Sequence, residues 1–246
     1  LGALQRELDE AAAASPGQLP DLERRQSLLL KQINSLKPWV EETLESLITD
    51  ELRRQGVPLQ LGSFVFPPVD IALDPLPTIL ITSPRDRIER TNSYLLNPEL
   101  TPATRDSVED AVLREEDLSA LVENLGGLST FPAIVHSRGL LGALTIGSHE
   151  WLHNYLFFQP LGRNYNLDGN MSSLNETTAN IFGDEIGWRI FKLLTGEPIP
   201  EPRPPGEPEP CPEDHFCFNR EMHETRSEAD DLLAQGKIEE AEVYME

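Results

Sequence analysis

Hydrophobic side chains in residues 1–56 recur mostly at steps of three to four positions, with charged residues between them. This spacing places the apolar side chains on one face of a helix, so it predicts an amphipathic helical arm that ends at Gly56. We expect the arm to pack on its own domain, with docking on a partner or a membrane as the alternative. The apolar face consists of Leu29, Ile33, Leu36, Val40, Leu44, Leu47 and Leu52.

The pattern changes after Gly56. Short runs rich in β-branched and aromatic residues at 64–66, 69–73 and 78–82 predict strands, and the prolines between them favour short or edge strands. Helical spacing returns over 103–124. Residues 128–135 then predict one further strand, in which Pro132 indicates an edge position.

Two further helices follow. Residues 139–158 are apolar on most sides, which predicts a central buried helix, and a second helix is predicted from about residue 174 to 194. The predicted organisation is α+β: a helical arm (1–56), a core (57–196), a proline-rich linker (197–213) and a helical C-terminal segment (214–246).

The chain has 42 acidic and 20 basic side chains, a net charge of −22. Such a surface repels phosphate backbones, so we expect no nucleic-acid partner. No apolar run is long enough to predict a membrane span. The chain begins at Leu1 and stops within a helical pattern, so we expect a longer protein, which leaves an extracytoplasmic or membrane-tethered location open. Oligomeric state and a bridge between Cys211 and Cys217 are also left open.

The strongest chemical motif is His149-Glu150-Trp151-Leu152-His153, on the predicted buried helix. Side chains four residues apart share one helical face, so His149 and His153 can reach the same metal ion. Glu150 is turned about 100° away from His149 around the helix. It therefore lies beside the metal, where it can act as a general base toward a metal-bound water.

A catalytic zinc ion needs a third protein ligand and one open position. Glu176, on the second predicted helix, is the expected ligand, which gives one Zn²⁺ per chain. Asn180, one turn further along, is expected to bond the free ring nitrogen of a histidine ligand.

Glu176 also has a structural explanation. Ser173-Leu174-Asn175-Glu176 matches a capping box, in which the glutamate bonds back to the helix N-terminus. Asp168, Asp184 and Glu185 are the spare ligand candidates. The glycosylation sequons at Asn170 and Asn175 are interpreted as incidental.

These residues resemble the gluzincin metallopeptidases, which combine His-Glu-x-x-His on one helix with a glutamate ligand on the next, often within Asn-Glu-x-x. Here the matching motifs are His149 to His153 and Asn175-Glu176-Thr177-Thr178, and the specific match runs from Ser148 to Glu185. The resemblance implies a zincin-like fold, with a small mixed sheet over the active-site helix.

The resemblance also implies that the edge strand of that sheet pairs with the substrate backbone. The matching segment would be Ser129, Thr130, Phe131, Pro132 and Ala133, which could equally be an ordinary core strand. The Gly-x-Met-Glu-Asn motif of the large gluzincin aminopeptidases is absent, so exopeptidase action has no support. Tyr165, His223, Arg226 and Tyr244 are the candidates for stabilising the developing oxyanion.

The sequence thus predicts a zinc peptidase acting on peptides or proteins. A catalytically silent zincin-like binding or scaffold module is the alternative, and zinc-dependent hydrolysis of a non-peptide amide or ester is a third. The intact Glu150 favours the enzyme, because a silent site does not need its base.

Overall fold

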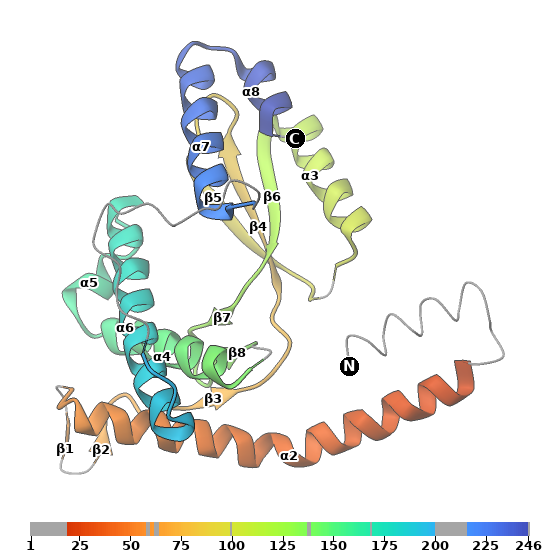
Figure 1. Ribbon diagram of the computed structural model, residues 1–246. Coiled ribbons are helices and arrows are strands. Elements are labelled where there is room, and N and C mark those ends of the chain that lie inside the picture. Colours follow the sequence, from red (N-terminus) through yellow and green to blue (C-terminus); the bar gives the residue numbers. More distant parts are fainter. Residues whose placement is uncertain are drawn as a thin grey trace.

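The computed structural model describes residues 19–57, 60–61, 64–98, 100–136, 139–167, 169–199 and 216–245. It mixes helices with short strands, which confirms the α+β class (Figure 1). The helices are α2 (Leu19–Arg54), α3 (Pro102–Glu116), α4 (Leu140–Leu156), α5 (Pro160–Arg163), α6 (Gly169–Thr195), α7 (Phe218–Ala234) and α8 (Ile238–Met245). The strands are β1 (Gln60–Leu61), β2 (Phe64–Val65), β3 (Ile71–Ala72), β4 (Thr78–Pro84), β5 (Asn92–Leu96), β6 (Leu118–Asn124), β7 (Gly127–Leu128) and β8 (Ala133–Val135).

The strands form two separate three-stranded sheets and a small β1–β2 ladder. The first sheet is mixed, in the order β3-β8-β7: β3 runs parallel to β8, and β7 runs antiparallel to it. The second sheet is antiparallel, in the order β5-β4-β6. The chain passes between the sheets twice, from β3 to β4 and from β6 to β7, so the two sheets are neighbours (Figure 1).

The main core lies where α2, α4 and α6 meet the mixed sheet. Its completely buried side chains include Ile48, Leu144 and Ile190, one from each helix. Trp151 of α4 is 2% exposed, stacks on Tyr155 and Phe182, and donates a hydrogen bond from Nε1 to the Pro67 carbonyl oxygen at 2.8 Å. These contacts attach α4 to α6 and to the segment that precedes β3.

Two glutamates of α2 cover the free edge of β3. Glu45 Oε1 accepts the Ile71 amide at 2.9 Å, and Glu41 Oε1 accepts the Leu73 amide at 2.6 Å. These side chains satisfy backbone donors that an edge strand otherwise leaves exposed. The sheet is therefore closed on the α2 side and open on the β7 side.

Helices α4 and α6 pack unusually closely, because α6 has glycines at the contact. A Cβ atom added to Gly183 would lie 2.6 Å from the Thr145 carbonyl oxygen and 3.0 Å from His149 Cβ. A Cβ atom added to Gly187, one turn later, would lie 2.8 Å from the Thr145 amide nitrogen. Only residues without a side chain allow this approach, so these glycines bring the two helices of the predicted site together.

The predicted helix over 103–124 is wrong beyond Glu116. Asp117 adopts a left-handed conformation with φ 55°, which ends α3. Residues 118–124 then pair with β4 along their whole length as β6. The pairing with β4 outweighs the local helical spacing, because a strand in a three-stranded sheet gains both hydrogen bonds and packing.

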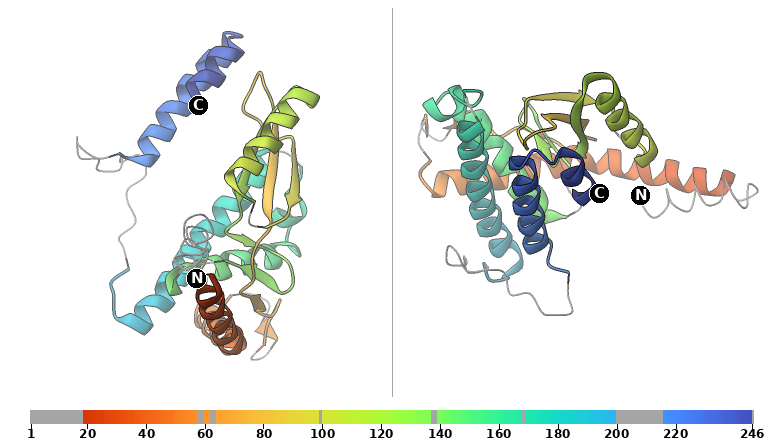
Figure 2. Two further views of the ribbon diagram at one scale, coloured as in Figure 1. Left: turned by 90° about the vertical axis from the view of Figure 1, so that its right-hand side faces the viewer. Right: turned by 90° about the horizontal axis from the view of Figure 1, so that it is seen from above.

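The predicted helical arm is confirmed over α2, but its packing is only half as expected. Leu44, Ile48 and Leu52, in its second half, are buried, whereas Ile33 and Leu36 are 45% and 60% exposed. Figures 1 and 2 show the first half of α2 extending beyond the rest of the described chain. Residues 1–18 and most of the predicted linker (200–213) lie outside the described residues.

The C-terminal segment contains the predicted pair of helices, α7 and α8. Arg85, just after β4, forms a two-point ion pair with Glu242 of α8, with both N···O distances at 2.8 Å, and also contacts Asp117. Among the described helices, none has the length and apolar character needed to cross a membrane.

Candidate functional site

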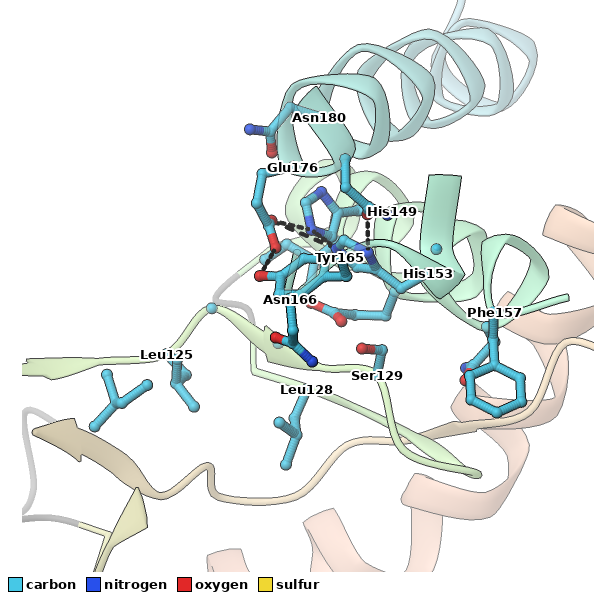
Figure 3. A pocket seen from close by; sticks show the side chains of 18 of the residues that line it. Leu125, Leu128, Ser129, His149, His153, Phe157, Tyr165, Asn166, Glu176 and Asn180 are labelled. Carbon is cyan, nitrogen blue, oxygen red and sulfur yellow. Dashed lines mark hydrogen bonds and ion pairs between the residues drawn. The ribbon is translucent and has the colours of Figure 1, made fainter. Parts of the chain in front are cut away.

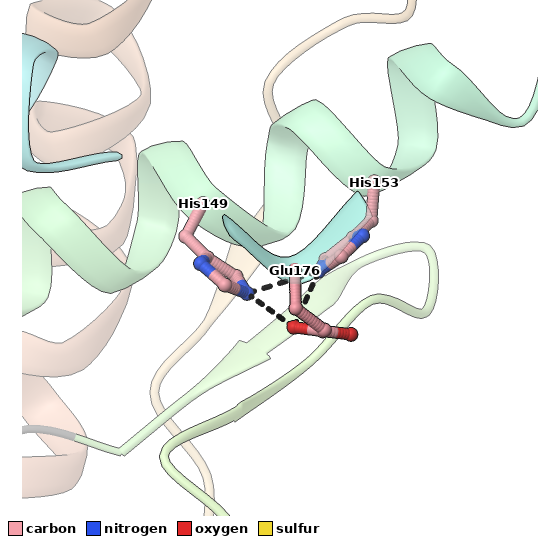
Figure 4. Close-up of side chains that lie close together, drawn as sticks. All are labelled: His149, His153 and Glu176. Atoms are coloured by element: carbon pink, nitrogen blue, oxygen red, sulfur yellow. Dashed lines mark hydrogen bonds and ion pairs between the residues drawn. The ribbon is translucent and has the colours of Figure 1, made fainter. Parts of the chain in front are cut away.

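His149 and His153 point toward the same place from the middle of α4. Their Nε2 atoms are 2.9 Å apart, and Oε2 of Glu176 on α6 lies 3.5 Å from the first and 3.4 Å from the second (Figure 4). The three ligand atoms form a compact group that could hold a metal ion. Of the spare candidates, Asp184 and Glu185 are not part of this group, and Asp168 lies outside the described residues.

Helix α6 begins at Gly169, which excludes the capping-box explanation of Glu176. Ser173 is four residues inside the helix and is not at its N-cap, so Glu176 has no helix end to close. Its carboxylate instead faces α4. The Tyr165 hydroxyl donates a hydrogen bond to Glu176 Oε1 at 2.7 Å, and Oε2 is directed at the histidines.

The residue that orients His153 is Asn175, and the prediction of Asn180 is wrong for this histidine. Asn175 Oδ1 lies 2.9 Å from His153 Nδ1, and its amide group donates to the Leu161 carbonyl at 3.3 Å. Asn175 is 1% exposed and faces α4. Asn180 is four residues after Glu176 and therefore shares its face, but its exposed side chain points away from both imidazoles (Figure 3).

Glu150 lies beside the two histidines under strand β7. Its side chain is 6% exposed, and among the described residues it forms no ion pair with a lysine or arginine. Burial raises its pKa, and the nearby His149 and His153 and a hydrogen bond with Ser129 oppose this only in part. A carboxyl group with a raised pKa is suited to exchanging protons near neutral pH.

Contacts at the triad shift the pKa values of Glu176, His153 and Tyr165. Hydrogen bonds from His149 and His153 hold the pKa of Glu176 far below its usual range, so its carboxylate stays ionised as a metal ligand must. Burial lowers the pKa of His153, but the contacts with Glu176, Glu150 and Asn175 together raise it by more. Burial and the bond to Glu176 together raise the pKa of Tyr165 to about 12, so its phenol remains a donor.

The triad opens into a cleft of about 1180 Å³ between α4, α6 and the strands β5, β6 and β7. Figure 3 shows Leu125 and Phe157 on opposite sides of the triad, with Ser129 turned toward it from the strand side. Small-molecule pockets usually have about 300–1,000 Å³. The cleft is therefore large enough for an extended chain of several residues.

The prediction that Ser129 to Ala133 form the edge strand is wrong. Residues 129–132 form the turn between β7 and β8, with hydrogen bonds from Thr130 to the carbonyls of Leu128 and Pro132, and Ala133 begins the central strand β8. The free edge of the mixed sheet is β7, Gly127–Leu128, which lines the cleft. The prediction treated 128–135 as one strand, although Pro132 cannot donate a ladder hydrogen bond.

Of the four oxyanion candidates, Tyr165 lines the cleft. His223, Arg226 and Tyr244 lie on α7 and α8 and are not among the cleft residues, and Arg226 pairs with Asp230 at 2.7 Å. The burial of Asn175 leaves no room for a glycan, which agrees with an incidental sequon. Cys217 is disulfide-bonded, and Cys211 lies outside the described residues.

Comparison of the chain with models of known protein families found no match. Searches of curated proteins and of solved structures also found no match. The functional argument therefore depends on the geometry of the described residues.

Proposed function

We propose that the protein is a zinc-dependent peptidase of the gluzincin type with a zincin-like fold. The observation that carries the proposal is the convergence of His149, His153 and Glu176 on one point, with the buried Glu150 beside it. A buried glutamate without a lysine or arginine partner among the described residues and two facing imidazoles are costly to keep in a helical core, and a metal-dependent hydrolase needs this combination.

The distances between the donor atoms fit zinc. Zinc binds histidine nitrogen and carboxylate oxygen at about 2.0–2.1 Å, so two ligands at tetrahedral corners lie about 3.3 Å apart. The three separations here are 2.9, 3.4 and 3.5 Å. Two imidazoles and one carboxylate also form a donor set typical of catalytic zinc, which leaves the fourth position for water.

Zinc, when bound, supplies Lewis acidity that lowers the pKa of its water to about 7 and polarises the substrate carbonyl. Glu150 then accepts the proton of the attacking water and passes it to the amine that leaves. Asn175 keeps the His153 ring turned so that Nε2 faces Glu176. Tyr165 holds one carboxylate oxygen of Glu176, so that a single oxygen faces the histidines.

Strand β7 is the proposed platform for the substrate backbone. Gly126 accepts a hydrogen bond from the His136 amide, so Gly126 and His136 form a hydrogen-bonded pair of the antiparallel ladder. Such pairs alternate with pairs whose backbone groups point outward, and Gly127 opposite Val135 is of the second kind. The amide and carbonyl of Gly127 are thus available to a peptide added alongside β7.

The test combines metal analysis with cleavage of a peptide library. We expect one equivalent of zinc per chain, cleavage that a chelator abolishes and zinc restores, and retention of zinc in Glu150→Gln with a loss of rate of about 10²–10⁴-fold. Zinc binding without any cleavage would favour the silent module. Cleavage of esters or non-peptide amides alone would favour the third hypothesis, and an equally active Glu150→Gln variant would show that the base is another group.

A further inference from the structure

The backbone of Gly127 lies directly against the side chain of Glu150. A Cβ atom added to Gly127 would lie 2.8 Å from Glu150 Cγ and 2.7 Å from Cδ, and closer still to Oε1. These separations are well below ordinary carbon–carbon contact, which is about 3.5–4.0 Å. Any side chain at position 127 would therefore displace the Glu150 carboxylate.

The backbone conformation does not explain the glycine. Among the described residues, the glycines with positive φ are Gly56, Gly196 and Gly236, and Gly127 is not one of them. Gly127 lies within a regular strand, where glycine costs stability compared with a residue that has a side chain. An alanine could adopt the same backbone conformation, so the reason for glycine is the space that Glu150 occupies.

The free space next to Glu150 is the cleft that its side chain lines. Elsewhere the residue is enclosed, because only 6% of it is exposed. Helix α4 is in turn fixed by its close packing against α6. A group added above Glu150 would be accommodated mainly by rotation of the carboxylate away from its present place.

We propose that Gly127 is a positioning residue for Glu150: its missing side chain makes the recess that keeps the carboxylate beside His149 and His153. The same residue presents its backbone amide and carbonyl to the cleft edge. One residue would thus fix the base and the adjoining backbone of the bound peptide relative to each other. The catalytic part of this proposal rests on the proposed peptidase function, whereas the recess itself does not.

The recess is tested by a double-mutant cycle in thermal unfolding of the full chain, without any activity measurement. We expect Gly127→Ala to lower the Tm by roughly 5 °C in the parent, as overpacking in a chain of this size does. In a Glu150→Ala background the same change should shift the Tm by less than about 1 °C, because the side chain it would meet is gone. Equal losses in both backgrounds would overturn the proposal.

Gly126→Ala is the matched control. It places a methyl group one residue earlier on the same chain segment, where the nearest atom is Ile146 Cδ1 at 3.9 Å. We expect its Tm to stay within about 1 °C of the parent in both backgrounds, because the added methyl group makes only an ordinary van der Waals contact. A decrease in Tm as large as that of Gly127→Ala would show that this segment tolerates no side chain, independently of contact with Glu150.

The catalytic consequence is tested on the zinc-loaded chain. We expect Gly127→Ala to keep its zinc content and to lose about 100-fold in kcat, because a displacement of about 1 Å can cost that much. Gly126→Ala should keep kcat within about twofold of the parent. Full activity of Gly127→Ala would overturn the positioning role. If the parent itself cleaves nothing, the peptidase proposal fails, and the unfolding cycle still decides whether Gly127 seats Glu150.

Discussion

The two three-stranded sheets differ in the buried polar side chains around them and in the partners of those side chains. In the β5-β4-β6 sheet the buried polar side chains are Thr78 and Thr82, and both find partners nearby: Thr78 donates to the Asn97 carbonyl at 3.1 Å, and Thr82 lies 3.4 Å from the Thr91 hydroxyl. In the layer formed by the mixed sheet and its helices, the buried polar groups include Glu150 and Asn175, which gather at one point on α4 and α6.

The two sets of buried polar groups differ in what they cost the stability of the fold. A threonine hydroxyl bonded to its own sheet costs little, whereas a buried carboxylate without a full partner costs several kcal/mol. Glu51 of α2 illustrates the structural solution: it is 3% exposed but is paired with Arg54 at 2.8 Å and with Gln55 at 2.7 Å. Among the described residues, Glu150 has no such cationic partner, and this difference supports its proposed role as the general base.

The largest effect is expected from removing Glu176, which tests whether the polar groups on α4 and α6 form a metal site. We expect Glu176→Ala to lower zinc affinity by more than about 100-fold, since even the loss of an outer partner of a ligand costs about 10–100-fold. Competition with a chromogenic chelator measures the change. Glu185→Ala is the control, because Glu185 is on the same helix but bonds Arg189 at 2.7 Å. Equal losses for the two variants would remove Glu176 from the ligand set.

The next largest effect on zinc affinity is expected from Asn175→Ala. Its comparison with Asn180→Ala decides which asparagine orients a histidine ligand. Asn175→Ala should weaken zinc binding by about 10–100-fold, because the His153 ring loses the group that fixes its orientation. Asn180→Ala should change zinc affinity by less than about twofold, as at other exposed positions. The same competition assay decides, and the reverse order of effects would restore Asn180 as the orienting residue.

Much of the site could be predicted because helical spacing is a local property. The positions of His149, Glu150 and His153 on one helix follow from their separation in the sequence, and the structure brings Glu176 to them as expected. Asn175 could not be chosen over Asn180 in advance, because that choice depends on which side of α6 is turned toward His153 on α4. The helix starts several residues before the predicted boundary, at Gly169.

The sheet was harder to predict. Residues 118–124 have the spacing of a helix but become β6, because β4 provides a partner far away in the sequence. The run 128–135 divides into two strands, and only the pairing of β8 with β3 determines which of them is the edge. Glycines 183 and 187, four residues apart on one helix, were a readable sign of close helix packing. Their partner, Thr145, became known only from the fold.

The close packing of α4 on α6 predicts that a side chain added at their contact lowers the stability of the folded protein. Gly183→Ala would place a methyl group 2.6 Å from the Thr145 carbonyl and 3.0 Å from His149 Cβ, so we expect a loss of about 2 kcal/mol in the free energy of unfolding. Denaturant unfolding measures it. Gly169→Ala, at the start of the same helix with open space around it, should be neutral within about 0.5 kcal/mol. Equal values would mean that the two helices can separate without cost.

The smallest effect is expected in the second sheet, where Leu95 of β5 lines the cleft but is 57% exposed. Leu95→Ala removes apolar surface that a bound peptide would cover in part, so kcat/KM should fall about threefold to tenfold. Zinc affinity and the Tm should not change, because Leu95 touches neither the triad nor the main core. Steady-state kinetics together with the chelator assay measure both quantities. A loss of zinc in this variant would mean that the second sheet helps to hold the metal site and is more than a wall of the cleft.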